Sequence, residues 1–276
     1  MNILVIGGHG LVGRNVVARL RAAGHETTAA SRSTGVDVTT GKGLRQALVG
    51  IDVVVDVSNS PSFDDVSAFE FFKAASEHLL AAETEAGVRH HVSLSVVGTG
   101  LLDDSHYLRG KALQEVLIRH SGIPFTVVHA TQFYEFLVDI VSSAVRDQTV
   151  RLSSAFIQPV ASDDVAAVVA EAAVSMPING SIQVAGPTRE RLFDIVQRFL
   201  IDIEAPCDVI LDADAPYFGA ILDEDVLLPR ADATLGARGF QEWLEQSEYS
   251  RVGWQSGWRG DGFLGNVIFD SSKSTG

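Results

Sequence analysis

A glycine-rich turn near the N-terminus constrains this chain more than any other feature of its sequence. The apolar residues 3–6 before the turn predict a buried strand, and residues 11–23 after it have the apolar spacing of a helix. Gly7, Gly10 and Gly13 lie between the two. In this setting the backbone can approach a pyrophosphate closely, while the helix N-terminus offers free N–H groups. We therefore expect the chain to open with a dinucleotide-binding βαβ unit.

The glycines follow the spacing G-x-x-G-x-x-G rather than G-x-G-x-x-G. Each of them can still serve a tight turn, a close approach to phosphate or the packing of helix on strand. A glycine turn that binds nothing is the alternative. The position between strand and helix favours binding, with Leu11 and Val12 at the helix start as further contacts.

The residues after the second predicted strand, 26–30, bear on the identity of the cofactor. An acidic residue there would bind the ribose of NAD, but this chain has Ser31, Arg32 and Ser33. Arg32 can pair with a 2′-phosphate and the hydroxyls can add hydrogen bonds, so NADP(H) is favoured over NAD(H). Arg14 at the helix start is a second candidate. The alternative is that Arg32 is a solvated surface charge.

Strands and helices alternate through the first 130 residues, which predicts a Rossmann-type, doubly wound parallel sheet. The further helices of this part are predicted at 44–49, 66–86 and 107–120, and the further strands at 53–57, 92–95 and 125–129.

Beyond residue 130 the alternation weakens. Helices are predicted at 133–146, 163–175 with Ser162 as cap, 189–201 and 240–246, and strands at 156–160 and 181–185, the latter as the last strand of the sheet. We expect one NAD(P)-binding domain over 1–246, with a smaller C-terminal substrate lobe mainly from 131–160 and 187–246. Residues 247–276 form a tail without a periodic pattern.

Composition excludes several classes of partner. The 35 acidic residues outnumber the 21 basic ones and give a net charge of -14, which disfavours direct binding of nucleic acid. The single cysteine, Cys207, cannot form an internal disulfide, and no apolar run reaches the ~18 residues of a membrane span. We expect a cytoplasmic monomer or homodimer that acts on a small-molecule substrate.

Several motifs resemble a known family. They are the glycine turn, Arg32, YLRGK at 107–111, SGIPFTVVHATQF at 121–133, QPV at 158–160, DDVA at 163–166 and VAGP at 184–187. Together they resemble the short-chain dehydrogenase/reductase superfamily, in its atypical, extended NmrA-like NAD(P)-binding branch. The resemblance runs from residue 1 to about 200 and continues more weakly to about 246. It implies either a reductase of carbonyl, quinone or enone groups or a regulator that only binds dinucleotide.

Tyr107 and Lys111 are the candidate catalytic pair. One helical turn apart, they lie on one face, where the ammonium can lower the pKa of the phenol that protonates a developing alkoxide. The pair resembles the superfamily's Tyr-x-x-x-Lys motif. The alternative is an exposed Tyr and Lys on an ordinary helix.

The serine expected as the third member of the catalytic group has no certain position. Ser95 lies twelve residues before Tyr107, close to the spacing of shorter family members. Alignment with extended members instead places the position at Val97, which has no hydroxyl. Ser95 is our candidate. Substitution by Ser93, a tyrosine that works alone and a degenerate site remain open.

The resemblance also implies further contacts. Asp37 and Val38 would contact adenine, Val57 and Ser58 a ribose, Lys111 the nicotinamide ribose, and Thr131, Gln132 and Phe133 the surroundings of the nicotinamide and substrate. Phe133, Tyr134 and Phe136 could wall the substrate site or belong to the core. We predict no metal site, because His90 and His91 face opposite sides of a strand and, with His129, are better interpreted as structural.

The leading hypothesis is an NADPH-dependent oxidoreductase that reduces a small apolar carbonyl or quinone-type substrate. The intact Tyr107 and Lys111 pair favours it. The first alternative is a non-catalytic NAD(P)-binding redox sensor, which the missing hydroxyl at Val97 favours. The second is a nucleotide-sugar epimerase or dehydratase, although such enzymes usually have a larger C-terminal lobe.

Overall fold

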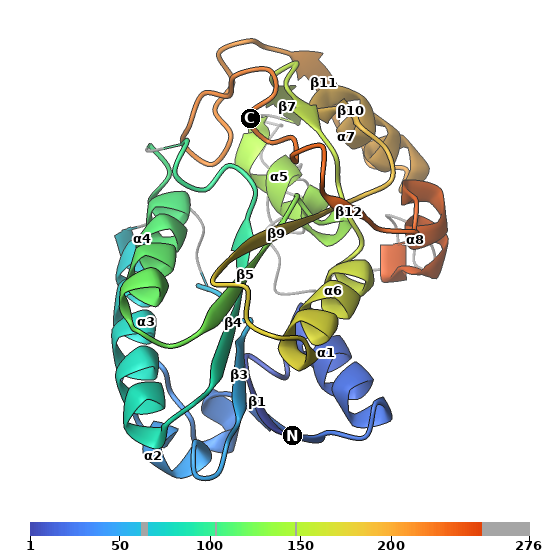
Figure 1. The fold of residues 1–276 in the computed structure, drawn as a ribbon. Coiled ribbons are helices and arrows are strands. Elements are labelled where there is room, and N and C mark those ends of the chain that lie inside the picture. The colour runs from blue at the N-terminus through green and yellow to red at the C-terminus, as the bar shows by residue number, and fades with distance from the viewer. Residues whose placement is uncertain (62–65, 103, 147, 250–276) are drawn as a thin grey trace.

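A parallel sheet of seven strands forms the centre of the structure, a computed structural model that describes residues 1–61, 66–102, 104–146 and 148–249 (Figure 1). Its spatial order is β2-β1-β3-β4-β5-β9-β12, and every neighbouring pair is parallel. The strands are β1 (Asn2–Ile6), β2 (Glu26–Ala30), β3 (Val53–Asp56), β4 (His90–Val96), β5 (Phe125–Ala130), β9 (Gly180–Ala185) and β12 (Thr234–Leu235). The predicted Rossmann-type sheet is confirmed. β12 was not predicted, and it replaces 181–185 as the last strand.

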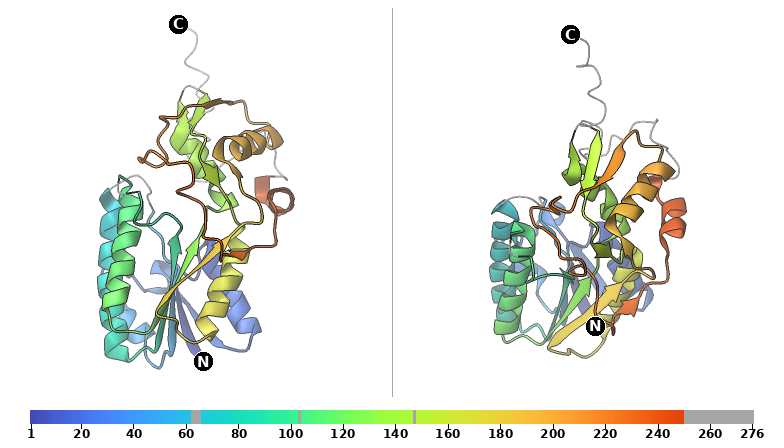
Figure 2. Two further views of the ribbon diagram at one scale, coloured as in Figure 1. Left: turned by 45° about the horizontal axis from the view of Figure 1, so that its top comes forward. Right: turned by 90° about the horizontal axis from the view of Figure 1, so that it is seen from above.

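Helices cover both faces of this sheet (Figure 2). One face carries α1 (Leu11–Ala22) and α6 (Ser162–Val174), and the other α2 (Leu44–Ala47), α3 (Val66–Ala86) and α4 (His106–His120). Side chains of a strand alternate between faces, so Ile3 and Val5 pack under α1 while Leu4 and Ile6 pack under α2 and α3. Burial on both faces explains why β1 and β3 are nearly uninterrupted apolar runs.

A second group of elements lies beyond the carboxyl ends of the main strands (Figure 1). Its helices are η2 (Tyr134–Phe136), α5 (Leu137–Ala144), α7 (Leu192–Asp202) and α8 (Phe240–Gln246). Its strands are β6 (Val145–Arg146), β7 (Thr149–Leu152) and β11 (Asp208–Leu211) in one sheet, and β8 (Phe156–Ile157) and β10 (Glu190–Arg191) in another. These elements share a hydrophobic cluster of their own, in which Trp243 stacks on Tyr134 at 5.4 Å. The division into a domain and a substrate lobe stays a prediction.

Several predicted elements of this second group are wrong in detail. The single helix at 133–146 is divided into η2 and α5 and ends in β6. The strand at 156–160 is reduced to β8, which pairs with β10 where the sequence predicts the start of a helix. Ser162 is not the cap of α6: Ala161 holds that position, and the Ser162 hydroxyl donates to Glu135 Oε1 at 2.6 Å. In each case a partner distant in sequence overrides the local pattern. From residue 250 the predicted tail lies outside the described residues.

The segment after β8 fixes the backbone that leaves β5. The Thr131 hydroxyl donates to the Gln158 carbonyl at 2.6 Å, and the Val160 N–H donates to the Gln132 carbonyl at 2.8 Å. Gln158 and Gly186 bond to each other twice, through the Gly186 N–H at 3.1 Å and the Gln158 amide at 2.7 Å. The ends of β5 and β9 are therefore held in one hydrogen-bonded unit, which positions residues 131–133.

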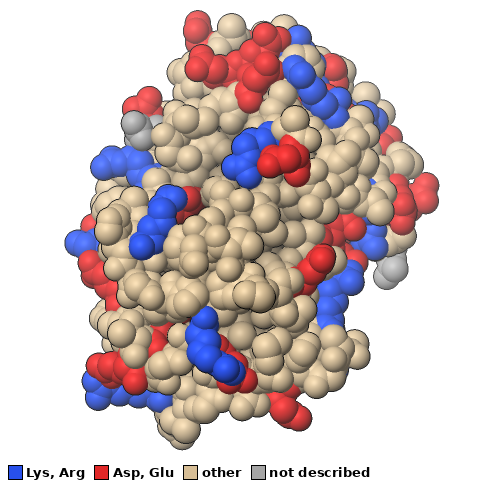
Figure 3. All heavy atoms as spheres, viewed as in Figure 1, with Lys and Arg blue, Asp and Glu red and all other residues tan. Residues whose placement is uncertain are grey.

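The surface has no broad basic area on the face shown in Figure 3, where basic side chains are scattered and several lie beside acidic ones. Ion pairs occur among the described residues, as between Arg191 and Glu224, which are 2.7 Å apart. Among the described residues, no helix combines the length and the hydropathy needed to cross a membrane.

Gly186→Ala should destabilise the fold strongly. A Cβ at this position would lie 1.6 Å from the Pro159 carbonyl oxygen, so the backbone at Gly186 or at Pro159 would have to shift. We expect the free energy of unfolding to fall by about 3 kcal/mol in urea titrations. Gly180→Ala, at the start of β9, is the control, because its Cβ would come no closer than 3.7 Å to a neighbour. Equal midpoints for the two variants would contradict this account.

Candidate cofactor and substrate site

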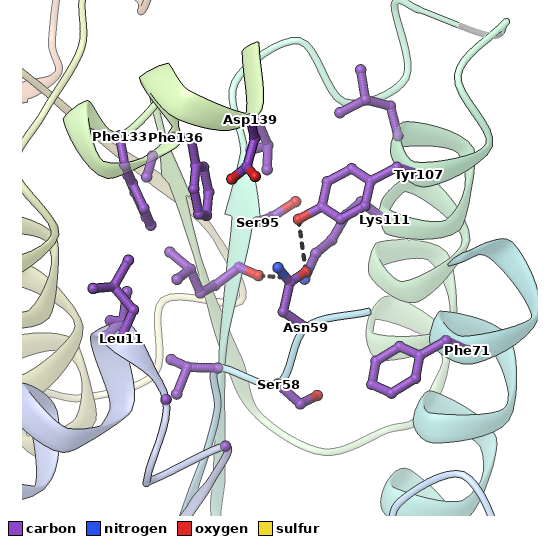
Figure 4. Close-up of a pocket in the computed structure, with 18 of the residues that line it drawn as sticks. Leu11, Ser58, Asn59, Phe71, Ser95, Tyr107, Lys111, Phe133, Phe136 and Asp139 are labelled. Carbon is purple, nitrogen blue, oxygen red and sulfur yellow. Dashed lines mark hydrogen bonds between the residues drawn. The ribbon is translucent and has the colours of Figure 1, made fainter. Parts of the chain in front are cut away.

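A cavity of about 420 Å³ opens at the carboxyl edge of the main sheet (Figure 4). It extends from the glycine turn after β1, across the ends of β3, β4 and β5, to α4, α5 and residues 217–227. The strand order reverses between β1 and β3, since β2 and β3 lie on opposite sides of β1. Doubly wound sheets bind ligands at this reversal, outside the carboxyl ends of the strands.

The three glycines of the turn are required for three different reasons. Gly7 has a φ of +76°, and a Cβ there would lie 2.8 Å from the Val57 carbonyl oxygen. A Cβ at Gly13 would lie 2.1 Å from the Gly7 carbonyl oxygen, so Gly13 lets α1 pack on the turn. Gly10 is exposed and lines the cavity. A Cβ added at Gly10 would have only the Gly7 carbonyl oxygen near it, at 3.2 Å. This leaves the backbone open to a phosphate group at the N-terminus of α1.

Most of the residues predicted to bind the cofactor line this cavity. They are Gly7, Gly10, Leu11, Val12, Ser31, Arg32, Asp37, Val38, Val57, Ser58, Lys111, Thr131 and Phe133. Gly13 is buried under the turn, and Arg14 and Ser33 are exposed outside the lining.

Hydroxyl groups surround the cavity end at Arg32, which begins the short helix η1 (Arg32–Thr34). The Ser31 hydroxyl is 2.7 Å from that of Ser33 and 3.1 Å from His9 Nδ1. The pKa of Asp37 is lowered, mainly by a hydrogen bond from Thr39 and further by the charge of Arg32. This end therefore combines a cation with hydroxyl donors.

Tyr107 and Lys111 both face the cavity from α4 (Figure 4). The Tyr107 hydroxyl donates to Asn59 Oδ1 at 3.0 Å. Burial raises the pKa of Tyr107, in contrast to the lowering expected from the Lys111 ammonium, so the phenol is protonated and able to donate. Lys111 is buried and donates to the Leu94 carbonyl at 2.9 Å and to Gln114 Oε1 at 3.0 Å. Burial lowers the pKa of Lys111 to about 8, against the opposing charges of nearby carboxylates.

The glycine of the YLRGK motif has a structural role that sequence reasoning missed. A Cβ at Gly110 would lie 2.8 Å from the Phe72 ring and 3.1 Å from the Phe69 Cα. Its absence lets α3 approach α4 closely. The Phe72 ring then meets Tyr107 edge-on at 5.3 Å and lies under the Lys111 ammonium, 4.3 Å from its centroid.

A chain of hydrogen bonds connects the loop after β3 to Lys111. Asp56, buried at the end of β3, accepts from the Ser58 N–H at 3.0 Å and from the Ser58 hydroxyl at 2.6 Å. Its second oxygen accepts from Gln114 Nε2 at 2.9 Å, and Gln114 accepts from Lys111. Sequence analysis gave Asp56 and Gln114 no role, although an aspartate that ends a valine run is a visible signal.

Ser95 lines the cavity, but its hydroxyl donates to Glu115 Oε1 at 2.6 Å, within the layer between sheet and α4. Glu115 Oε1 also lies 2.7 Å from His129 Nε2. Burial raises the pKa of Glu115, yet the bonds from His129 and Ser95 and the charge of Arg119 outweigh it and lower the pKa overall. The aligned position, Val97, is buried, and Ser93 is buried outside the lining. The catalytic role of Ser95 stays a prediction.

The histidines contact separate partners. His90 Nε2 lies 3.0 Å from the Thr126 hydroxyl and His91 Nδ1 lies 3.0 Å from Glu83, while His129 contacts Glu115. In the part of the chain that the structure describes, no three His, Cys, Asp or Glu side chains are grouped as metal ligands.

The far end of the cavity is largely aromatic. Phe133 and Phe136 line it and stack at 5.1 Å, whereas Tyr134 is buried in the core with Trp243. Gln132 also lines the cavity; its side-chain oxygen is buried and has no partner among the described residues. The other lining residues of this end, which sequence analysis missed, are Asn59, Asp139, Tyr217, Phe218 and Leu227.

Two curated relatives are similar to parts of the chain. One is a (4-alkanoyl-5-oxo-2,5-dihydrofuran-3-yl)methyl phosphate reductase of Streptomyces griseus, 35% identical over 144 residues, which are 48% of this chain and 48% of the reductase. The other is the photosystem II assembly factor Ycf39 of Cyanophora paradoxa, 23% identical over 54% of this chain and 50% of that protein. The chain thus spans about half the length of each.

Solved structures share the fold over most of the chain. The dTDP-glucose 4,6-dehydratase DesIV of Streptomyces venezuelae, a double mutant with NAD bound, has a TM-score of 0.69 at 17% identity and covers 91% of this chain and 97% of its own. A UDP-glucose 4-epimerase of Thermus thermophilus with NAD has a TM-score of 0.62 at 18% identity, and the match covers 83% of this chain and 92% of the epimerase. These likenesses concern the fold alone.

A family model for NAD(P)H-binding proteins matches residues 7–175, which include the glycine turn and the Tyr107 helix. The chain therefore belongs to the NAD(P)H-binding family, in agreement with its resemblance to the atypical NmrA-like branch of the short-chain dehydrogenase/reductase superfamily.

Proposed function

We propose that this protein is an NADPH-dependent reductase of small, largely apolar carbonyl or quinone compounds. One observation carries the proposal: the glycine turn, Arg32, Tyr107 and Lys111 all line the same cavity. A cofactor bound along the turn would bring its nicotinamide toward the side chain that can donate a proton. The Streptomyces griseus relative, named as a reductase, supports this reaction class.

The lining residues suit NADPH at both of its ends. Gly10 and the N-terminus of α1 would hold the pyrophosphate, and Arg32 with Ser31 would bind the 2′-phosphate. The unpartnered oxygen of Gln132 would accept from the carboxamide N–H of the nicotinamide. Of the three Lys111 donors, two bond to Leu94 and Gln114, and the third would bind the nicotinamide ribose.

The reaction needs a proton at the substrate oxygen as hydride reaches the carbon. NADPH supplies the hydride when bound. The Tyr107 hydroxyl, released from Asn59, donates its proton to the developing alkoxide, and the Lys111 ammonium stabilises the phenolate that remains. Phe133 and Phe136 exclude water and favour an apolar substrate. The second group of elements, from 131–160 and 187–246, would form the substrate lobe.

A dinucleotide sensor without turnover is the second candidate. The Ser95 hydroxyl is bound to Glu115, and Val97 provides no replacement, so the substrate oxygen has one donor fewer than in a complete catalytic group. The relative named as an assembly factor fits this alternative.

Tyr107→Phe tests the proposed proton donor. Oxidation of NADPH with a panel of quinones and ketones should fall by about 100-fold or more, because the general acid is lost. Binding of NADPH, measured by fluorescence titration, should persist. Tyr134→Phe in the core serves as the control. Equal rates in Tyr107→Phe and the wild type would remove Tyr107 from the mechanism, and no turnover of any compound by the wild type would favour the sensor.

Arg32→Ala tests the preference for NADPH. Loss of charged hydrogen bonds worth about 1.5–3 kcal/mol should weaken NADPH binding roughly 10-fold to 100-fold and leave NADH binding nearly unchanged. Arg45→Ala, which removes a surface ion pair between α2 and Glu85 of α3 outside the cavity lining, is the control. A variant that keeps the wild-type preference for NADPH would refute the assignment.

The pH dependence of the rate tests the role of Lys111. With a pKa of about 8, Lys111 is charged below pH 8 and loses its proton above it. The rate of reduction should therefore fall as pH rises through about 8, while Lys111→Met should be slow and nearly flat between pH 7 and 9. Parallel profiles of the two proteins would show that another group titrates.

A further inference from the structure

Two acidic side chains of the described residues line the cavity: Asp37, which lies near Arg32, and Asp139, to which the proposed reaction gives no role. Asp139 projects from α5, and Figure 4 shows its carboxyl between Phe136 and Tyr107, directed into the cavity. Asp139 is partly buried, and it lies at the aromatic end, away from Arg32.

The partly buried Asp139 differs from the fully buried acidic side chains in having no hydrogen-bond or ion-pair partner among the described residues. Asp56 accepts from Ser58 and Gln114, Glu83 pairs with His91, and Glu115 pairs with Ser95 and His129. Among the described residues no hydrogen bond or ion pair reaches the Asp139 carboxyl. Asp139 is partly buried and lines the cavity, so its carboxyl is open to a ligand group that donates a hydrogen bond to it.

The surroundings of Asp139 show what kind of ligand would satisfy it. Burial raises the pKa of Asp139, and no cation of the described residues opposes this. Two phenols lie within reach of its charge: burial chiefly raises the pKa of Tyr217 and of Tyr249, and the Asp139 charge contributes to both shifts. Tyr217 and Phe218 meet edge to face at 4.8 Å in the same wall. Aromatic rings and a carboxylate are the two groups that bind organic ammonium ions in proteins.

We propose that Asp139 determines substrate specificity by binding a protonated amine of the substrate. This rests on the proposed function in so far as the aromatic end of the cavity is the substrate site. The ammonium group would form an ion pair with Asp139 while Phe136 and Tyr217 pack against the adjoining apolar part. An anionic group at the same place would meet like charge and be excluded.

Binding of three matched probes tests the proposal without any need for turnover. The probes are 2-phenylethylamine, 2-phenylethanol and 3-phenylpropionate, which differ in the charge at the end of one phenylalkyl frame. Calorimetry with the NADP⁺-loaded wild type should give the amine at least about 10-fold higher affinity than the alcohol, because a charge-assisted bond is added. The carboxylate should bind most weakly. In Asp139→Asn the amine affinity should fall to that of the alcohol, and Asp225→Asn, at a surface ion pair with Arg189, should behave as the wild type.

Equal affinity of the wild type for amine and alcohol would overturn the proposal, as would failure to bind the amine or a retained preference in Asp139→Asn. Should Asp139→Asn not fold, Asp139→Leu makes the same comparison with a side chain of similar size. Failure of the reductase proposal would be seen separately, as no oxidation of NADPH by any compound despite a preserved amine preference.

Discussion

The close contact between the turn after β1 and the end of β3 is the constraint on which the rest of the structure depends. Both strands run parallel, and the chain leaves β1 for β2 on one side before it returns to β3 on the other. The helices that follow β1 and β3, α1 and α3, lie on opposite faces of the sheet, and this leaves an opening at the strand ends. The Gly7 backbone lies against Val57 and Ser58, and a Cβ at Gly7 would lie 2.8 Å from the Val57 carbonyl oxygen. The end of the opening at Gly7 is therefore lined by main-chain atoms. A cavity that exposes main-chain N–H groups at its floor follows from this packing.

Hydrogen bonds join that floor to α4, the helix that carries Tyr107 and Lys111. Ser58, Asp56, Gln114 and Lys111 form a continuous chain, so the loop that would hold a ribose and the ammonium beside Tyr107 are positioned together. Burial of these groups costs free energy unless each of them is paired. Their pairing fixes the geometry of Lys111, while burial brings its pKa down to about 8. The Asp139 carboxyl, which has no partner among the described residues, is the exception, and it lines the cavity.

Local patterns predicted the first half of the fold well. The valine run of β3 and the long helix α3 were identified because a β-branched run and helical spacing are properties of neighbouring residues. In the second half the same reasoning placed one helix at 133–146 and missed β7 and β11. Those strands are short and pair with each other across more than fifty residues, so their stability depends on contacts that no local pattern contains.

The sequence by itself determined that a glycine turn opens a parallel sheet, that a cation follows the second strand, and that Tyr107 and Lys111 share a helix face. Each of these follows from spacing along the chain. Only the tertiary structure decided where the polar groups point: Tyr107 bonds to Asn59, 48 residues away, and Ser95 turns to Glu115. It also placed Asp139 in the cavity. Side-chain direction is chosen by the partners that folding brings together, and these partners lie on other elements.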